Sequence, residues 1–503
     1  MVRAFLLTMA LFMGLSATAG AQTITDVIFF SFNSTVHETA TTPPGRIYDI
    51  PADHGVVSFL TAPLAGFDYI TYGHYFDMPN GTITSATLTL TLRQNDDPPE
   101  TASAVHGDGQ VSWIGSVASG THDYTLTVDP LFFNQYPGIY PVTIACYLGD
   151  FAIDKSVLTV HYDPAPPTLD FNGDRLSDAF LYNSTTGAWS EHFGSGIGFA
   201  NITNGWWAAG WQITPADFNA DGISDLFLYH PDYGSWYKAI GDGAGNFAYY
   251  SGEWSPGWDV RAAELNGDGR SDIFLFHPTL GIWYRCVSPA NPADGFIYSS
   301  GYWSPGWTIY TVDWNGDSKT DLFLYNKTNG SWYRVTNVDP DPGVWNYSPG
   351  SWMPGWDIYP GDFNGDGKTD MFLYMPDSGA WYVAMNTGSG FSYTAGYWAP
   401  GWSVYSGDFD GDGATDIFVY GTTTGQWYQC ISDKAGYFSA YYTGNWSAVW
   451  QVQVSDFNND GKSDILLHYP DWGVWYLCVT QPAAGTFAYN QGIWEPGMAL
   501  VKR

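Results

Sequence analysis

A nine-residue acidic pattern that recurs seven times in this chain has the composition of a metal-binding loop. Its most regular copy, at 362–370, reads Asp-Phe-Asn-Gly-Asp-Gly-Lys-Thr-Asp. Positions 1, 3, 5 and 9 carry carboxylate or amide oxygens, and position 7 can offer its backbone carbonyl. The glycines at positions 4 and 6 permit the positive φ angles that fold a short loop around an ion. Alternating oxygen ligands in a tight loop are what a hard cation needs.

We expect these loops to bind Ca²⁺, up to seven ions in all, because oxygen ligands favour Ca²⁺ over softer metals and Mg²⁺ prefers to keep its water shell. The predicted ligands are Asp170, Asn172, Asp174, Asp178, Asp217, Asn219, Asp221, Asp225, Glu264, Asn266, Asp268, Asp272, Asp313, Asn315, Asp317, Asp321, Asp362, Asn364, Asp366, Asp370, Asp408, Asp410, Asp412, Asp416, Asp456, Asn458, Asp460 and Asp464. The alternative is a solvated acidic turn, because Asn, Asp and Gly are ordinary turn formers. The loop differs from an EF-hand, because position 12 of the fifth copy is Leu373 and strands, not helices, flank it.

The seven copies are predicted to differ in affinity. The sixth is the most acidic, because Asp410 takes the place of the usual Asn, and it should bind most tightly. Arg175 and Ser318 stand where glycine is usual in the first and fourth copies, and Glu264 replaces the leading Asp of the third. We expect these three sites to be the weakest.

The spacing of the loops predicts the fold. The copies begin 46 to 49 residues apart, and a fixed period of this size indicates units that bury their apolar faces on their neighbours. Each repeat contains four short apolar or alternating segments joined by Gly- and Pro-rich turns, which predicts a seven-bladed β-propeller. The first repeat lacks the Trp-containing segment that precedes the others, and the chain ends with a spare one. We therefore expect 498–501 to complete the blade that holds Asp170 and close the ring.

At 362–374 the loop followed by Met-Phe-Leu-Tyr resembles the FG-GAP/VCBS repeat. That repeat builds the calcium-stabilised seven-bladed propeller of integrin α chains, certain fungal lectins and many exported bacterial proteins. The resemblance covers about 170–503, and it implies that the four side-chain positions of each loop are metal ligands. The fungal lectins place sugars between blades. Because propellers host many functions, the resemblance does not name the activity.

The N-terminal third has a different organisation. Residues 1–21 read as a secretory signal peptide, with Arg3, an apolar run and the small residues 19–21, so we expect the mature protein to be secreted. No later segment has the length of a membrane span. Strict alternation at 87–92 predicts a β-sandwich over 22–163. A proline-rich linker at 164–169 follows, and the propeller is predicted over 170–503.

The formal net charge of −33 excludes nucleic acid as a natural partner, since phosphates demand the opposite sign. Six loops carry three acidic residues and one carries four, which accounts for 22 of the 50 in the chain. The acidity is thus explained largely by metal sites. Four cysteines do not make a disulfide scaffold at this length. Cys286, Cys430 and Cys478 share their repeat position with Ala and Val, so we expect free, buried thiols.

Aromatic residues make up 18% of the chain, and most occupy fixed places in the repeat. Positions such as those of Trp381 and Trp398 are Trp in all seven repeats, which predicts packing between blades. Aromatic residues that vary between repeats are better candidates for an exposed, ligand-binding role. These candidates are Trp206, Tyr233, Tyr302, Tyr397 and Trp472.

The chain contains no nucleophile elbow, phosphate-binding loop or zinc-type His pair. We therefore expect a protein that is not an enzyme: a secreted, calcium-stabilised propeller that binds glycans or an extracellular protein. One alternative is a structural subunit that self-assembles into an extracellular fibre or coat. A less favoured alternative is a hydrolase with its activity in the N-terminal domain.

Overall fold

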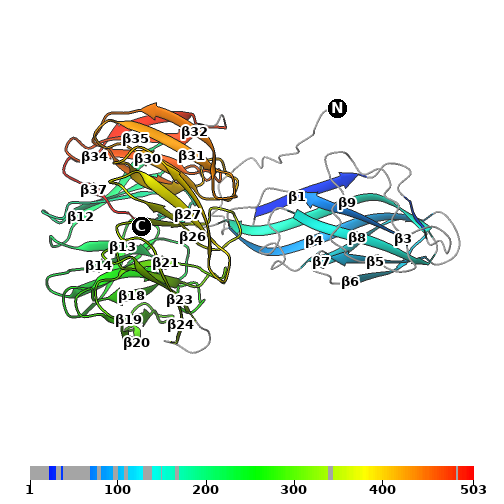
Figure 1. Cartoon of the computed structure of the whole chain (residues 1–503), viewed down its shortest axis with the longest axis horizontal. Coiled ribbons are helices and arrows are strands. Elements are labelled where there is room, and N and C mark those ends of the chain that lie inside the picture. The colour runs from blue at the N-terminus through cyan, green and yellow to red at the C-terminus, as the bar shows by residue number, and fades with distance from the viewer. Residues whose placement is uncertain are drawn as a thin grey trace. The chain divides into compact units, whose positions relative to one another are not determined.

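The computed structural model of the chain describes residues 22–29, 35–37, 68–75, 81–94, 100–106, 111–128, 139–148, 150–164, 169–337, 344–482 and 485–502. The chain divides into two compact units, Met1–Ala165 and Pro166–Arg503 (Figure 1). Within the described ranges all regular structure is β-strand, so no helix there could span a membrane. The predicted signal peptide and positions 165–168 of the predicted linker lie outside the described residues.

The first unit contains two antiparallel sheets, ordered β1-β9-β4-β7, with β2 on β9, and β3-β8-β5-β6. The strands are β1 (Gln22–Phe29), β2 (Thr35–His37), β3 (Asp68–Tyr75), β4 (Gly81–Gln94), β5 (Glu100–His106), β6 (Val111–Val117), β7 (Gly120–Val128), β8 (Ile139–Leu148) and β9 (Asp150–Pro164). The alternation in β4 has the predicted effect: Leu88, Leu90 and Leu92 are fully buried. A buried hydrogen bond of 2.9 Å between His74 Nε2 and Ser156 Oγ joins β3 of one sheet to β9 of the other. This unit is a β-sandwich.

The second unit is a seven-bladed propeller of four-stranded antiparallel sheets (Figure 1). The first blade contains β37 (Ala499–Leu500), β10 (Ala179–Tyr182), β11 (Ala188–Gly194) and β12 (Phe199–Trp206); the second contains β13 (Gln212–Ala216), β14 (Asp225–Tyr229), β15 (Ser235–Gly241) and β16 (Phe247–Glu253). The third contains β17 (Asp259–Ala263), β18 (Asp272–Phe276), β19 (Ile282–Val287) and β20 (Ile297–Tyr302); the fourth contains β21 (Thr308–Val312), β22 (Asp321–Tyr325), β23 (Ser331–Asn337) and β24 (Trp345–Ser351). The fifth contains β25 (Asp357–Gly361), β26 (Asp370–Tyr374), β27 (Ala380–Asn386) and β28 (Phe391–Tyr397); the sixth contains β29 (Ser403–Gly407), β30 (Asp416–Tyr420), β31 (Gln426–Ser432) and β32 (Phe438–Asn445); the seventh contains β33 (Gln451–Ser455), β34 (Asp464–Tyr469), β35 (Val474–Thr480) and β36 (Phe487–Ile493). The predicted fold class and blade number are confirmed.

The ring is closed by the C-terminal strand, as predicted. β37 pairs with β10 through Leu181 opposite Leu500 and Tyr182 opposite Ala499. The backbone N–H of Val501 donates to the carbonyl of Phe180 at 2.8 Å. Because β37 lies beside β10, it takes the innermost place in the first blade, which the first strand of each other blade occupies.

Seven apolar clusters lie between neighbouring blades, one at each interface around the ring. The Trp on the third strand of every blade is buried, and it lies against a glycine of the fourth strand, as Trp381 does against Gly396. A Cβ at Gly396 would come within 2.1 Å of that ring, so this position requires glycine. The predicted packing role of the recurring Trp residues is confirmed, and so are the free, buried thiols of Cys286, Cys430 and Cys478.

Deletion of 494–503 should open the ring. It removes β37 together with Trp494 and Met498, which are buried in the cluster between the seventh and first blades. We expect a large fall in the melting temperature, measured by calorimetry, and a loss of cooperativity, because one interface loses its closing strand. Deletion of 502–503 alone keeps β37 and serves as the control. Equal melting temperatures for the two truncations would contradict closure by β37.

The segment between the sixth and seventh blades contains a strained residue. Val449 has a φ of 121°, and the other six blade-connecting segments have a glycine with φ between 83° and 98° at this place, such as Gly401 and Gly497. A β-branched residue in this region costs on the order of 1–3 kcal/mol. Val449→Gly should therefore raise the free energy of unfolding, by about 1 kcal/mol after the entropy cost of glycine. Val449→Ala, which keeps a Cβ, should raise the free energy of unfolding by less. An alanine variant as stable as the glycine variant would show that the positive φ of Val449 does not destabilise the protein.

Candidate metal loops and ligand pocket

All seven acidic loops lie at one end of the blades, because each connects the first strand of a blade to the second. In the first blade, where β37 takes the place of the first strand, the loop precedes β10. The Asp at position 9 stands at the start of the second strand and is completely buried in every blade. Positions 4 and 6 have positive φ angles in all seven loops, including those where Arg175 and Ser318 replace glycine, with φ of 69° and 63°. The loops therefore keep one backbone conformation despite these replacements.

The position 9 carboxylate joins three segments of its blade. In the fifth blade, Asp370 Oδ2 accepts the N–H of Phe363 at 3.0 Å, and Oδ1 accepts the N–H of Asn386, at the end of the third strand, at 2.5 Å. The same pair of bonds occurs in every blade, with distances of 2.5–3.1 Å. The residues predicted as ligands at position 9 thus also hold the loop to the strands.

The side-chain oxygens at positions 1, 3 and 5 accept hydrogen bonds from backbone N–H groups of the loop. In the fifth loop, Asp362 Oδ1 and Oδ2 accept the N–H groups of Gly365 and Gly367 at 2.8 and 2.7 Å. Asn364 Oδ1 accepts the N–H of Asp366 at 2.9 Å, and Asp366 Oδ1 accepts that of Lys368 at 3.0 Å. These Asx-type turns fix the course of the backbone through the loop. The donor set is of hard oxygens, which fits Ca²⁺.

The position 9 carboxylate of each loop is held away from water. Burial raises the pKa of the carboxyl at position 9 to about 8 in Asp178, Asp416 and Asp464, and to about 7 in the other four blades. Burial likewise raises the pKa of Asp408 to about 6. The neighbouring carboxylates of each loop act in the same direction. A divalent cation at the centre would remove this cost by favouring the charged form.

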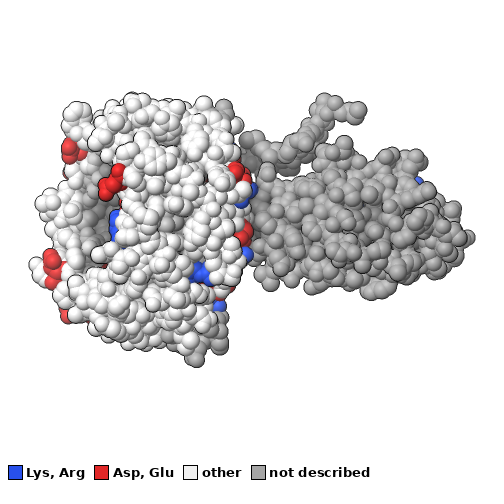
Figure 2. Space-filling model, in the orientation of Figure 1, with Lys and Arg blue, Asp and Glu red and all other residues white. Residues whose placement is uncertain are grey.

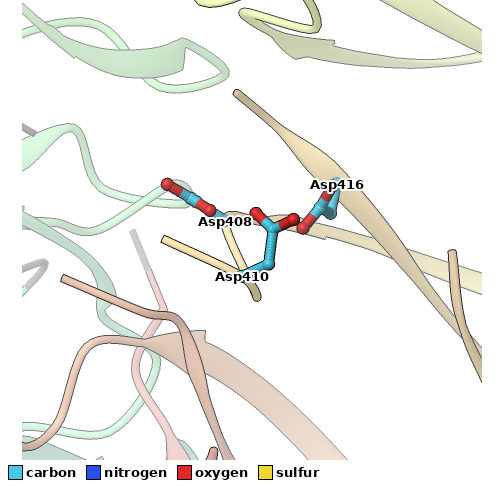
Figure 3. A group of neighbouring side chains, drawn as sticks. All are labelled: Asp408, Asp410 and Asp416. Carbon is cyan, nitrogen blue, oxygen red and sulfur yellow. The ribbon is translucent and has the colours of Figure 1, made fainter. Parts of the chain in front are cut away.

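The sixth loop comes nearest to a formed carboxylate site. Oxygens of Asp408, Asp410 and Asp416 all lie within 4.8 Å of one another, and Figure 3 shows Asp410 between the other two. Lys434 Nζ lies 3.3 Å from Asp412 Oδ2, and Lys462 Nζ donates to the backbone carbonyl of Asp410 at 2.6 Å. The three close carboxylates fit the expectation that this loop binds most tightly, whereas Lys434 pairs with a fourth predicted ligand, Asp412, and would compete there with a bound cation.

The third loop departs furthest from the others. Glu264 uses one oxygen, Oε1, to accept the N–H groups of Asn266, Gly267 and Asp268. Arg270 pairs with the Asp268 carboxylate, so a guanidinium neutralises a predicted ligand. Competition from Arg270 is thus a second reason, besides Glu264, to expect a weak site.

The hydroxyl at position 8 links each loop to the preceding blade, a role that the sequence interpretation missed. The N–H of Asp362 donates to Thr415 Oγ1 at 3.0 Å, and the N–H of Thr415 donates to the Asp362 carbonyl at 2.6 Å. The same reciprocal pair joins every neighbouring pair from the first blade to the seventh. At the closure, Ser177 Oγ donates to the Asp456 carbonyl at 2.8 Å. The presence of Ser or Thr at position 8 in all seven copies was the available signal.

The five aromatic candidates lie at the opposite end of the blades from the acidic loops. Trp206, Tyr302 and Tyr397 end the fourth strands of their blades, and Tyr233 and Trp472 lie in turns between second and third strands. Their exposed fractions are 68–74%, as expected for surface residues. They sit on different blades, so the structure does not bring them together into one site.

A pocket of about 200 Å³ lies between the fifth and sixth blades, lined by Trp398, Ala399, Trp402, Val419, Tyr428, Cys430 and Tyr441. Trp402 and Tyr428 meet edge to face, with ring centroids 5.5 Å apart. The Tyr428 hydroxyl accepts a hydrogen bond of 2.7 Å from Gln426 Nε2. Among the predicted candidates, Tyr397 directly precedes a residue of this pocket.

The Trp–Tyr pair of this pocket recurs at five other interfaces with centroid distances of 5.4–5.5 Å. The pairs are Trp211–Tyr237, Trp258–Tyr284, Trp307–Tyr333, Trp356–Tyr382 and Trp450–Tyr476. At the interface between the seventh and first blades, Met498 and Ser190 occupy the two places. The closing interface is therefore chemically different from the other six.

Comparison with solved structures finds similar chains at low sequence identity. A lectin from Agrocybe aegerita, described as recognising non-reducing terminal N-acetylglucosamine, is 14% identical over 65% of this chain and 90% of its own, with a TM-score of 0.49. The periplasmic gluconolactonase PpgL of Pseudomonas aeruginosa is 13% identical over 64% and 99%, with a TM-score of 0.45. The dihydro-heme d1 dehydrogenase NirN is 11% identical over 66% and 67%, with a TM-score of 0.42. The expectation that this chain is not an enzyme stays a prediction.

No curated protein matches the chain. A family model described as the FG-GAP-like repeat matches residues 217–275, 362–419 and 408–467, which span acidic loops and the strands around them. The unmatched blades have the same strand order and the same loop hydrogen bonds. The chain is therefore an FG-GAP repeat protein.

Proposed function

We propose that this protein is an exported, calcium-stabilised propeller that binds carbohydrate in aromatic pockets between its blades. The observation that carries the proposal is the pocket of Trp398, Trp402, Tyr428 and Tyr441. Sugars present flat C–H surfaces that stack on aromatic rings, while their hydroxyls need polar partners at the rim. Rings from two blades form the walls here, and the Tyr428 hydroxyl with Gln426 supplies such partners.

The size and charge of this region favour a small, neutral ligand. About 200 Å³ is below the roughly 300–1,000 Å³ of pockets for drug-sized molecules, which suits a single sugar ring. The residues that line the pocket are uncharged. On the propeller face seen in Figure 2, uncharged residues also predominate, and Asp and Glu form a few separate patches. The resemblance to fungal propeller lectins agrees with a site between blades.

Calcium has a structural role in this proposal. The loops lie at one end of the blades and the pocket lies towards the other end. An ion bound in a loop would therefore not contact a ligand in the pocket. It would hold the loop conformation on which the links between blades depend. An ion that binds the folded state alone stabilises it by about 2.7 kcal/mol per site at a concentration of 100 Kd.

Removal of calcium should lower the melting temperature by about 10 °C or more, because several sites contribute together. Calorimetry with Ca²⁺ and with EDTA measures the shift, and calorimetric titration of metal-free protein measures the stoichiometry. Asp410→Asn gives the sixth loop the side chain found in the other six. It should weaken Ca²⁺ binding at the sixth loop alone. Asp433→Asn, in an exposed turn of the same blade, is the control. Calcium-free protein with the original melting temperature would refute the metal proposal.

A glycan array should identify a carbohydrate ligand, whose affinity can then be measured by titration calorimetry. Tyr428→Phe removes one hydroxyl and keeps the ring, so it should weaken binding with little change in melting temperature. Trp402→Ala should weaken it more, by tenfold or more in Kd if the ring stacks on the sugar. Trp472→Ala, at an exposed residue outside the pocket, is the matched control. Loss of binding in the Trp472 variant and not in the pocket variants would move the site to the exposed aromatic residues.

A further inference from the structure

Two histidines occupy the interface that closes the ring, at places where other blades have no histidine. His468 ends the second-strand motif of the seventh blade, where the others have Tyr182, Tyr229, Phe276, Tyr325, Tyr374 or Tyr420. His192 stands where the others have Ala, Val or Cys. His468 is 0% and His192 2% exposed, so both imidazoles are enclosed by protein.

The two imidazoles flank one indole. The ring of His192 stacks on Trp494 with a centroid distance of 4.8 Å, and the ring of His468 lies 5.2 Å from the same residue. Trp494 begins the segment that leads into β37, and it belongs to the apolar cluster of the closing interface with Leu181 and Leu500. The two histidines therefore contact the segment that closes the propeller.

Few polar groups form hydrogen bonds with the two imidazole rings. His192 Nε2 lies 2.9 Å from Ser190 Oγ, but its Nδ1 and both nitrogens of His468 have no hydrogen-bond partner among the described residues. In five other blades the tyrosine at the place of His468 binds the blade-connecting segment; for example, the Tyr374 hydroxyl donates to the Ala399 carbonyl at 3.0 Å. His468 makes no such bond within the described part of the chain, so the closing segment is held less firmly.

Among the described residues, no carboxylate contributes to the shift in pKa of either imidazole. Each charged or titratable group nearby is directed elsewhere. On the first blade, Tyr182 belongs to the cluster shared with the second blade and Glu191 lies near Asp242, while on the seventh blade Tyr476 and Cys478 pack towards the sixth blade. The Tyr489 hydroxyl bonds Trp446, Tyr469 packs on Trp450 and Trp472, and Lys502 lies over Tyr405. Glu495 and Asp471 are exposed, and Asp178 and Asp464 lie at the end of the blades that carries the acidic loops.

Burial lowers the pKa of both His192 and His468 from 6.5 to about 4, and for His192 a charge on His468 adds to the effect. A histidine whose pKa is lowered by folding stabilises the folded state fully above pH 6.5. That contribution is lost as the pH falls from 6.5 towards 4, because the unfolded or opened chain takes up the proton more readily.

We propose that the closing interface is an acid-sensitive seam, at which mild acid releases Trp494 and β37 because His192 and His468 must otherwise carry charge inside an apolar interface. The six other interfaces have no buried histidine at these two places, so opening should begin here. The inference is independent of what the propeller binds.

Hydrogen–deuterium exchange of the full chain in saturating Ca²⁺ tests the proposal. Protection factors, corrected for intrinsic rates, are compared at pH 7.5 and pH 5.0 for 494–502 and for the corresponding segment 398–406. We expect the protection of 494–502 to fall about tenfold or more beyond that of 398–406, because a pKa lowered from 6.5 to about 4 makes protonation inside the folded interface unfavourable. Equal losses in the two segments overturn the proposal, and this comparison needs no variant.

Variants assign the effect to the histidines. His468→Tyr restores the residue of five other blades, and His192→Val introduces the residue at Val335. In the double variant the extra loss at 494–502 should disappear. The reverse change, Tyr420→His, should produce acid-sensitive exchange at 446–455, in the interface between the sixth and seventh blades. An acid-sensitive seam that persists without both histidines would overturn their role.

Discussion

The buried carboxylate at position 9 is the interaction on which the propeller depends. It accepts one backbone N–H from its own loop and one from the end of the third strand, at a place where water does not reach. Without that carboxylate two buried N–H groups would lack partners, at a cost of about 1–3 kcal/mol each. The carboxylate in turn must be kept charged although it is buried. A cation in each loop, as proposed above, would satisfy this need and would join metal binding to blade geometry in one side chain.

The loop also carries the connection from blade to blade. The hydroxyl at position 8 and the backbone of position 1 form a reciprocal pair at the six interfaces from the first blade to the seventh. At the closing interface Ser177 Oγ donates to the Asp456 carbonyl, so hydrogen bonds join the seven loops into a continuous ring. A shift in one loop therefore changes its neighbour directly. This connection explains why Arg175 and Ser318 keep the left-handed conformation that glycine adopts elsewhere. The cost of an unfavourable φ in one loop is smaller than the cost of losing its bonds to two blades.

Much of this architecture could be predicted because it is encoded locally and repeated. The period, the four strands per repeat and the spare C-terminal strand can be read without any knowledge of contacts. The role of Thr415 and its counterparts could not, because its partner Asp362 belongs to another blade. Trp398 was assigned to packing because it recurs, and the structure places it in the packed interface and in the wall of a pocket. Recurrence alone cannot separate the two roles when a ligand site repeats with the fold.

Three irregular positions of the repeat lie at the last two interfaces, and this has a mechanical consequence. Val449, His468 and Met498 each replace a residue type shared by most other blades, and the closing strand β37 has two residues where other first strands have five. In a closed ring each blade is held from two sides, so opening requires the loss of one interface and then proceeds from the exposed edges. The interface with the shortest strand, the missing tyrosine link and two buried imidazoles is the one that should fail first. The free energy of the first opening step is then set by this single interface and not by the average of seven.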